Sequence, residues 1–275
     1  MNAASVGFHC PMCAGTVPIG RARGSRIARR PTGWRDLEAG QTPVTRALVF
    51  VNVVVFLLTL VAGGSISSGG GDLTIDYGLV GYGRIRTGFL IDHIGVAEGE
   101  WWRIVTSAFL HGGIIHLAFN MFLLWMIGHQ LERNYGPGRY LGLVLGSLTA
   151  GSLGVMLLDP LALTVGASGA VFGLMGATVA LQVRRGISPW STGIGSLLLV
   201  NLLFTFARPN ISIGGHLGGL LGGLALGWAV DEADRRGSGR AVGSAVPVVF
   251  TMGCAAVTIW AAGRWWDPLL GLLPA

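Results

Sequence analysis

Four polar residues lie inside apolar stretches of this sequence, and their types suit acyl-transfer chemistry. Ser168 and His216 each lie in a glycine-rich apolar run. His116 and Asn120 are four residues apart, which places both side chains on one face of a helix. A serine is a weak nucleophile until an imidazole accepts its proton, and His and Asn side chains can donate to the oxyanion that forms next. The four residues therefore indicate a serine hydrolase centre.

Each of these residues also has a purely structural interpretation. Ser168 could cap a helix, which is the commonest use of serine at such a position. His216 could belong to a helix-packing motif, and His116 and Asn120 could form hydrogen bonds between helices. The catalytic interpretation gains weight only if the fold brings all four residues together.

The composition places the chain among membrane proteins. Of 275 residues, 51% are hydrophobic and 12% are charged, and the mean hydropathy is +0.62. Soluble domains carry roughly 25% charged residues. All the basic residues are Arg, and the net charge is +6. Because these Arg residues lie in a tail and in short loops beside apolar spans, they fit membrane-helix flanks better than a nucleic-acid surface.

Seven apolar spans predict an all-α, polytopic helical bundle. The spans cover residues 44–62, 112–130, 140–158, 168–183, 190–206, 213–230 and 244–263. At 1.5 Å per residue each can cross the hydrocarbon core, although the fourth and fifth are only just long enough.

The distribution of Arg predicts the orientation. Arg residues gather in the N-terminal tail and in the loops after the second, fourth and sixth spans. The positive-inside rule therefore predicts a cytoplasmic N-terminus in the cell membrane. The second, fourth and sixth spans then run from outside to inside, so His116, Asn120, Ser168 and His216 all lie in the outer half of the membrane.

Small residues predict that the fourth and sixth spans approach closely. Gly219 and Gly223 lie on the face of the sixth span that carries the histidine, and Gly169, Gly173 and Ala177 repeat every four residues in the fourth. Such an approach would bring the imidazole within reach of the serine hydroxyl. Because no Asp or Glu lies nearby in this layer, the centre would be a dyad.

With these residues in place, the sequence resembles the rhomboid intramembrane serine proteases over residues 45–232. The resemblance rests on short motifs: Trp102-Arg103, His116-Leu-Ala-Phe-Asn120, Glu132, Gly136, Gly166-Ala-Ser168-Gly169 and Gly215-His216-Leu-Gly-Gly219. It implies a protease core at 43–232 with six transmembrane helices, and a linker with a seventh helix at 233–275.

The resemblance also implies roles for individual residues. Ser168 would be the nucleophile and His216 the general base, with His116, Asn120 and the Ser168 backbone amide at the oxyanion. The substrates would be membrane proteins cleaved near the outer face, and no metal or organic cofactor would be required. Some relatives have a Tyr that stacks on the catalytic histidine; here Phe172 would stack instead.

The supporting residues are expected nearby. Gly166 and Gly169 flank the nucleophile, and Trp102-Arg103 belongs to a first loop that would lie partly in the outer leaflet. His111, five residues before His116, is expected near the surface as a loop anchor.

The N-terminal tail, residues 1–42, is rich in Arg, Gly and Pro and is expected to be a separate cytoplasmic segment. Cys10 and Cys13 form half of a zinc ribbon, and no second CxxC follows. Because a tetrahedral zinc site needs four ligands, this pair is a weak metal candidate.

Two other classes of function compete with proteolysis. A catalytically silent relative would bind client membrane helices, but such relatives lack one dyad residue. A small transporter would have polar groups at several depths and near the midplane. Both dyad residues are present, and the polar residues cluster in the outer half, so the sequence favours the enzyme.

Overall fold

The computed structural model of the chain describes residues 2–4, 7–9, 42–87, 89–209, 211–237 and 239–265. The chain divides into two units, Met1–Gln41 and Thr42–Ala275. In the first unit, strand β1 (Asn2–Ala4) pairs antiparallel with β2 (Gly7–His9). Cys10 and Cys13 lie outside the described residues, so the zinc expectation is untested.

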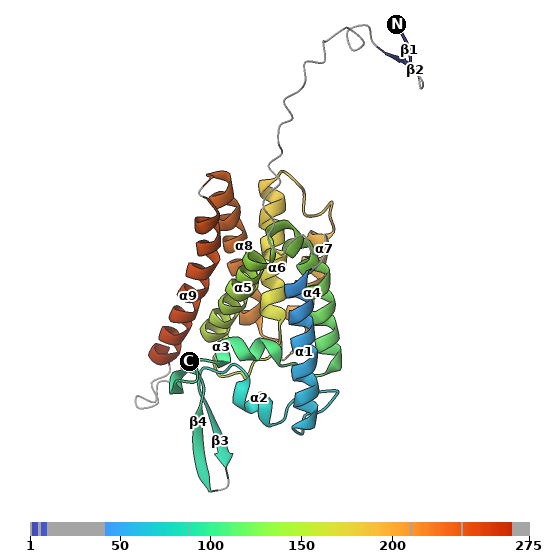
Figure 1. Cartoon of the computed structure of the whole chain (residues 1–275). Coiled ribbons are helices and arrows are strands. Elements are labelled where there is room, and N and C mark those ends of the chain that lie inside the picture. The colour runs from blue at the N-terminus through green and yellow to red at the C-terminus, as the bar shows by residue number, and fades with distance from the viewer. Residues whose placement is uncertain are drawn as a thin grey trace. The chain divides into compact units, whose positions relative to one another are not determined.

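The second unit is a helical bundle, in which each predicted apolar span corresponds to one helix (Figure 1). The helices are α1 (Pro43–Val61), α4 (Ile114–Tyr135), α5 (Pro137–Leu158), α6 (Ser168–Arg184), α7 (Ile194–Ala207), α8 (Ile213–Arg235) and α9 (Gly239–Trp265). The predicted all-α membrane bundle is confirmed.

Within the described residues, five helices are long and apolar enough to cross a membrane: α1, α4, α5, α8 and the Gly243–Gly263 part of α9. The chain is therefore a multi-pass membrane protein. The start of the fifth span, predicted at residue 190, was wrong. A turn occupies the residues before Gly193, whose φ of +83° is left-handed, so α7 begins at Ile194 and has 14 residues.

The loop between α1 and α4 is largely structured. It contains α2 (Asp72–Tyr77), the antiparallel strands β3 (Gly83–Thr87) and β4 (Leu90–Ile94), the 3-10 helix η2 (Val96–Glu98), α3 (Arg103–Thr106) and the 3-10 helix η3 (Ser107–Phe109). Figure 1 shows α2 and α3 against one end of the bundle, with the hairpin extending away from it. The end of the bundle covered by this loop is called the loop end below.

A long-range carboxylate cap joins α1 to α4 at the other end. Glu132 of α4 accepts hydrogen bonds from the backbone N–H of Val44 and Thr45 and from the Thr45 hydroxyl. The first N–H groups of a helix have no intrahelical partners, so this buried carboxylate satisfies them and complements the helix dipole. Gly136, with φ of +78°, then turns the chain from α4 into α5.

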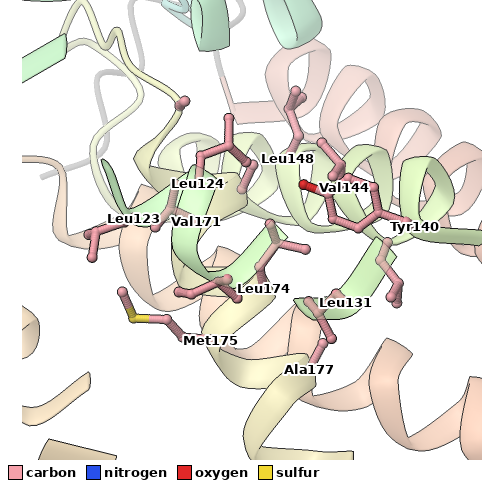
Figure 2. Packing of buried hydrophobic residues seen from close by; sticks show 14 of the residues in the cluster. Leu123, Leu124, Leu131, Tyr140, Val144, Leu148, Val171, Leu174, Met175 and Ala177 are labelled. Atoms are coloured by element: carbon pink, nitrogen blue, oxygen red, sulfur yellow. The ribbon is translucent and has the colours of Figure 1, made fainter. Parts of the chain in front are cut away.

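The main apolar core lies between α4, α5 and α6. Figure 2 shows Leu124 and Leu131 of α4, Val144 of α5, and Val171 and Leu174 of α6 packed together. Close packing of these buried side chains holds α4 and α6 at a fixed separation.

Backbone contact, with almost no intervening side chain, joins α6 to α8. A Cβ atom on Gly219 would collide with the carbonyl oxygen of Gly169, and one on Gly223 would collide with that of Gly173. Small residues spaced in this way allow helices to approach closely in a membrane. The predicted approach of these two spans is present in the structure.

Ion pairs join the same two helices at their C-terminal ends. The Arg184 guanidinium of α6 binds Asp231 and Glu232 of α8, and Arg235 also binds Asp231. The α6–α8 pair is thus held by backbone contact along its length and by charge at one end.

The α6–α8 contact predicts unequal effects for the same substitution at two glycines. Gly223→Ala should lower the free energy of unfolding by about 1–3 kcal/mol, because the added methyl overlaps the backbone of α6. Gly253→Ala in α9 is the matched control: a Cβ there meets nothing within 4 Å. Unfolding in mixed detergent micelles measures both. Equal stabilities of the two variants would contradict the close contact.

Candidate active site

Ser168 is the first residue of α6, at the loop end of the bundle. The loop before it is fixed by the Gly166 N–H, which donates to the Ser107 carbonyl at 2.9 Å, and by a bridge between Leu79 and Thr164. Gly166 has a φ of +124°, which a residue with a side chain rarely adopts. A Cβ there would also lie 2.7 Å from the His116 ring, so this position requires glycine for two independent reasons.

The serine does not cap the helix. Ala167 occupies the N-cap position and no side-chain cap hydrogen bond is formed. Ser168 Oγ has no hydrogen-bond partner among the described residues. Its backbone N–H, in the first turn of α6, also has no intrahelical acceptor. The hydroxyl is therefore available as a nucleophile, and the amide as an oxyanion donor.

His216 is held on two sides in the first turn of α8. Its ring stacks on Phe172 of α6, with centroids 4.2 Å apart and an interplanar angle of 19°. Its Nδ1 lies 2.7 Å from the Thr205 hydroxyl of α7. The stacking expected for Phe172 is present. Ser212 caps the start of α8, since its hydroxyl accepts a hydrogen bond from the Gly215 N–H, and the histidine lies one turn after this cap.

His116 presents an N–H toward the serine loop. The Gly112 N–H donates to His116 Nδ1 at 3.2 Å, so in the neutral ring the proton lies on Nε2. That Nε2 atom is 2.9 Å from the point where a Cβ of Gly166 would lie, and Ser168 Oγ is 3.7 Å from the same point. The His116 donor and the serine hydroxyl therefore face one small space.

Asn120 lies one turn further along α4 and is buried. Its Nδ2 donates to the His116 carbonyl at 2.9 Å. An amide nitrogen has two hydrogens, so one N–H remains for an oxyanion.

The structure thus gathers the four predicted site residues between α4, α6 and α8 at the loop end. Gly169 and Gly219 lie at the α6–α8 contact, beside the nucleophile and one turn after the histidine. The structure does not join the dyad by a hydrogen bond: among the described residues, none links Ser168 to His216. Catalytic hydrogen bonds are often long without substrate and shorten when it binds.

Arg103 fixes the long loop from within. It is 1% exposed, and its guanidinium donates to Glu100 at 2.6 Å and to the carbonyls of Ile75 and Gly78 at 2.6 and 2.7 Å. Trp102 is half-exposed, and its Nε1 donates to the Asp76 carbonyl at 3.4 Å. The Trp-Arg pair therefore organises the loop and does not contact the four site residues by any described hydrogen bond.

His111 lies just before α4 and is buried. It is 1% exposed, and its ring packs edge-on against His116 with centroids 5.2 Å apart. The residues around it are close-packed because the loop closes over the start of α4.

Sequence reasoning missed Thr205. The signal available was weak: one Thr in an apolar run, four residues after Asn201 and eleven before His216. Only the fold reveals that its hydroxyl contacts the histidine.

The sequence matches a known family model over about half of its length. Residues 98–232 match the model of the rhomboid domain, a segment that contains all four predicted site residues.

Individual relatives extend the match. The rhomboid protease GluP of Bacillus subtilis is 34% identical over 192 residues, which is 69% of this chain and 35% of GluP. The Bacillus subtilis protein YdcA is 38% identical over 129 residues, 46% of this chain and 65% of YdcA. RHOMBOID-like protein 5 of Arabidopsis thaliana is 38% identical over 127 residues. The chain spans about a third of GluP and just under two thirds of YdcA.

The Arg103 contacts predict that lysine cannot replace it. Arg103→Lys should lower the free energy of unfolding by about 1–3 kcal/mol, because a single ammonium cannot reach the three acceptors and leaves a buried polar group unpaired. Arg133→Lys, at an exposed position, is the matched control. Thermal melting in detergent measures both; equal melting temperatures would contradict the structural role of Arg103.

Proposed function

This chain belongs to the rhomboid family, and on that premise we propose that it is an intramembrane serine endopeptidase with Ser168 and His216 as its catalytic dyad. The proposed substrates are membrane proteins, cleaved in a transmembrane helix near the outer face. The proposal goes beyond family membership by assigning the dyad and the oxyanion donors to named residues of this chain.

One juxtaposition supports this proposal most. Phe172, one turn after Ser168, stacks on His216, while the loop before Ser168 lies against the His116 ring. A nucleophile, a base and an oxyanion donor from three separate helices thus converge where the serine hydroxyl has no other partner. A Ser that served only to cap α6 would not need this arrangement.

In the proposed reaction, Ser168 Oγ attacks the carbonyl carbon of the scissile peptide bond as Nε2 of His216 takes its proton. The tetrahedral oxyanion accepts hydrogen bonds from the Ser168 backbone N–H, His116 Nε2–H and the free N–H of Asn120. His216 then returns the proton to the leaving amine, and the acyl group remains on Ser168. Water, deprotonated by the same histidine, hydrolyses that ester and regenerates the serine.

The substrate helix must open locally before attack. A helical peptide bond is shielded, and its carbonyl is already hydrogen-bonded. The site lies at one end of the bundle, beside the loop, where water can satisfy the backbone groups that unwinding releases. This location favours cleavage near the membrane surface.

A second function is favoured by one observation. The absent Ser168–His216 hydrogen bond would suit a protein that holds client membrane helices without cutting them. Such a protein would bind the same helices and form no acyl-enzyme, which the following experiment distinguishes.

The first test uses the purified protein in liposomes with a fluorophosphonate probe and a model transmembrane substrate. Wild type should be labelled and should cleave, and Ser168→Ala and His216→Ala should each lose both activities. Asn120→Ala should lower kcat by about 10²–10³-fold, because it removes one oxyanion donor.

The controls are Ser188→Ala, at an exposed position, and His129→Ala, at a partly exposed position near the other end of α4; both should retain both activities. Labelling and cleavage that persist in Ser168→Ala would refute the nucleophile. A well-folded wild type that binds substrate helices but is neither labelled nor cleaves would favour the client-binding function.

We further propose that the N-terminus is cytoplasmic and the loop end faces the outside. In a background with Cys10, Cys13 and Cys254 replaced by Ser, Ser67→Cys in the loop should react with an impermeant maleimide on intact cells. Arg133→Cys at the opposite end should react only after permeabilisation. The reverse pattern would invert the topology.

A further inference from the structure

We propose that Thr205 is the positioning residue of the dyad: its hydroxyl oxygen accepts a hydrogen bond from Nδ1 of His216 and so directs Nε2 toward Ser168. This inference rests on the proposed function. It assigns to a threonine of α7 the orienting part that a carboxylate takes in a Ser-His-Asp triad.

The direction of the hydrogen bond follows from counting hydrogens. The Thr205 hydroxyl has one hydrogen, and it lies 2.8 Å from the Asn201 carbonyl, which can only accept. Toward Nδ1 of His216, at 2.7 Å, the hydroxyl then offers a lone pair. Nδ1 therefore carries the proton in the neutral ring, and Nε2 is free to act as the base.

The same bond becomes more important during the reaction. Once Nε2 has taken the serine proton, both ring nitrogens are donors, and Nδ1 requires an acceptor. Thr205 Oγ1 is the only acceptor that the described residues supply to it. Hydrogen bonds to charged groups are about twice as strong as neutral ones, so Thr205 stabilises the imidazolium more than the resting ring.

The surroundings of His216 offer its ring few other hydrogen-bond partners. The residue is 9% exposed, and Phe172 covers one ring face. No hydrogen bond joins the ring to a carboxylate of the described residues. A buried imidazolium without a counter-charge depends on hydrogen bonds for its stabilisation.

Thr205 itself is held in place. It is 2% exposed, and Asn201, one turn earlier, is also buried with its Nδ2 bonded to the Leu197 carbonyl. The neighbouring Phe204 and Phe206 are exposed, so a rotation of α7 by one residue would replace the hydroxyl by a phenyl ring. The buried face of α7 therefore sets the rotation of the helix about its axis, and this rotation places the Thr205 hydroxyl beside the histidine.

A purely structural role for Thr205 makes a different prediction, and the chain contains a matched control. Thr178 of α6 is also buried, and its hydroxyl bonds to the carbonyl four residues earlier at 2.8 Å, but no hydrogen bond among the described residues joins it to a histidine. If Thr205 served only to satisfy its own hydroxyl, both threonines would tolerate valine equally.

The test measures steady-state cleavage of a transmembrane substrate by the full-length protein in liposomes. Thr205→Val should lower kcat about 10- to 100-fold and leave KM unchanged, because a positioning hydrogen bond acts in the transition state. Thr205→Ser, which keeps the hydroxyl, should restore kcat to within about threefold of wild type, and Thr178→Val should change it less than about twofold.

The outcomes separate this inference from the one on which it rests. If wild type neither cleaves nor reacts with a fluorophosphonate, the proposed function fails. If wild type cleaves and Thr205→Val has an unchanged kcat, or Thr205→Ser falls as far as Thr205→Val, the positioning role is refuted. Melting temperatures verify folding; if Thr205→Val melts early, Thr205→Ala removes the hydroxyl with less bulk and gives the same two outcomes.

Discussion

The separation between α6 and α8 determines where every other part of the site can lie. One helix carries the serine and the other the histidine, and their backbones touch where Gly169 meets Gly219 and where Gly173 meets Gly223. Phe172, which stacks on His216, lies between Gly169 and Gly173 on α6. Because the contact is between backbones, the spacing of the two helices does not depend on a side-chain rotamer. The orientation of the His216 ring depends in addition on Phe172 and Thr205.

The sequence predicts a large part of this arrangement, for reasons that are local. The seven apolar spans are visible because lipid demands about twenty apolar residues for each crossing. The close approach of α6 and α8 is also visible, since small residues every fourth position leave a periodic trace. The positions of Ser168, His216, His116 and Asn120 at one end then follow from alternating helix directions.

Other features could not be predicted, because they depend on contacts between distant segments. Arg103 bonds to carbonyls of Ile75 and Gly78, and backbone carbonyls leave no mark in a sequence. The start of α7 depends on the turn at Gly193. Thr205 meets His216 only because of the rotation of α7 about its axis, and a nearly uniformly apolar helix carries little information about rotation.

α7 also has a consequence for the lipid around the protein. Its 14 residues span about 21 Å at 1.5 Å per residue, whereas the hydrocarbon core of a bilayer is about 30 Å thick. Local thinning of the bilayer is one way in which a short hydrophobic helix is accommodated. If the proposed function holds, a longer substrate helix beside α7 would meet such thinned lipid with its end outside the hydrocarbon.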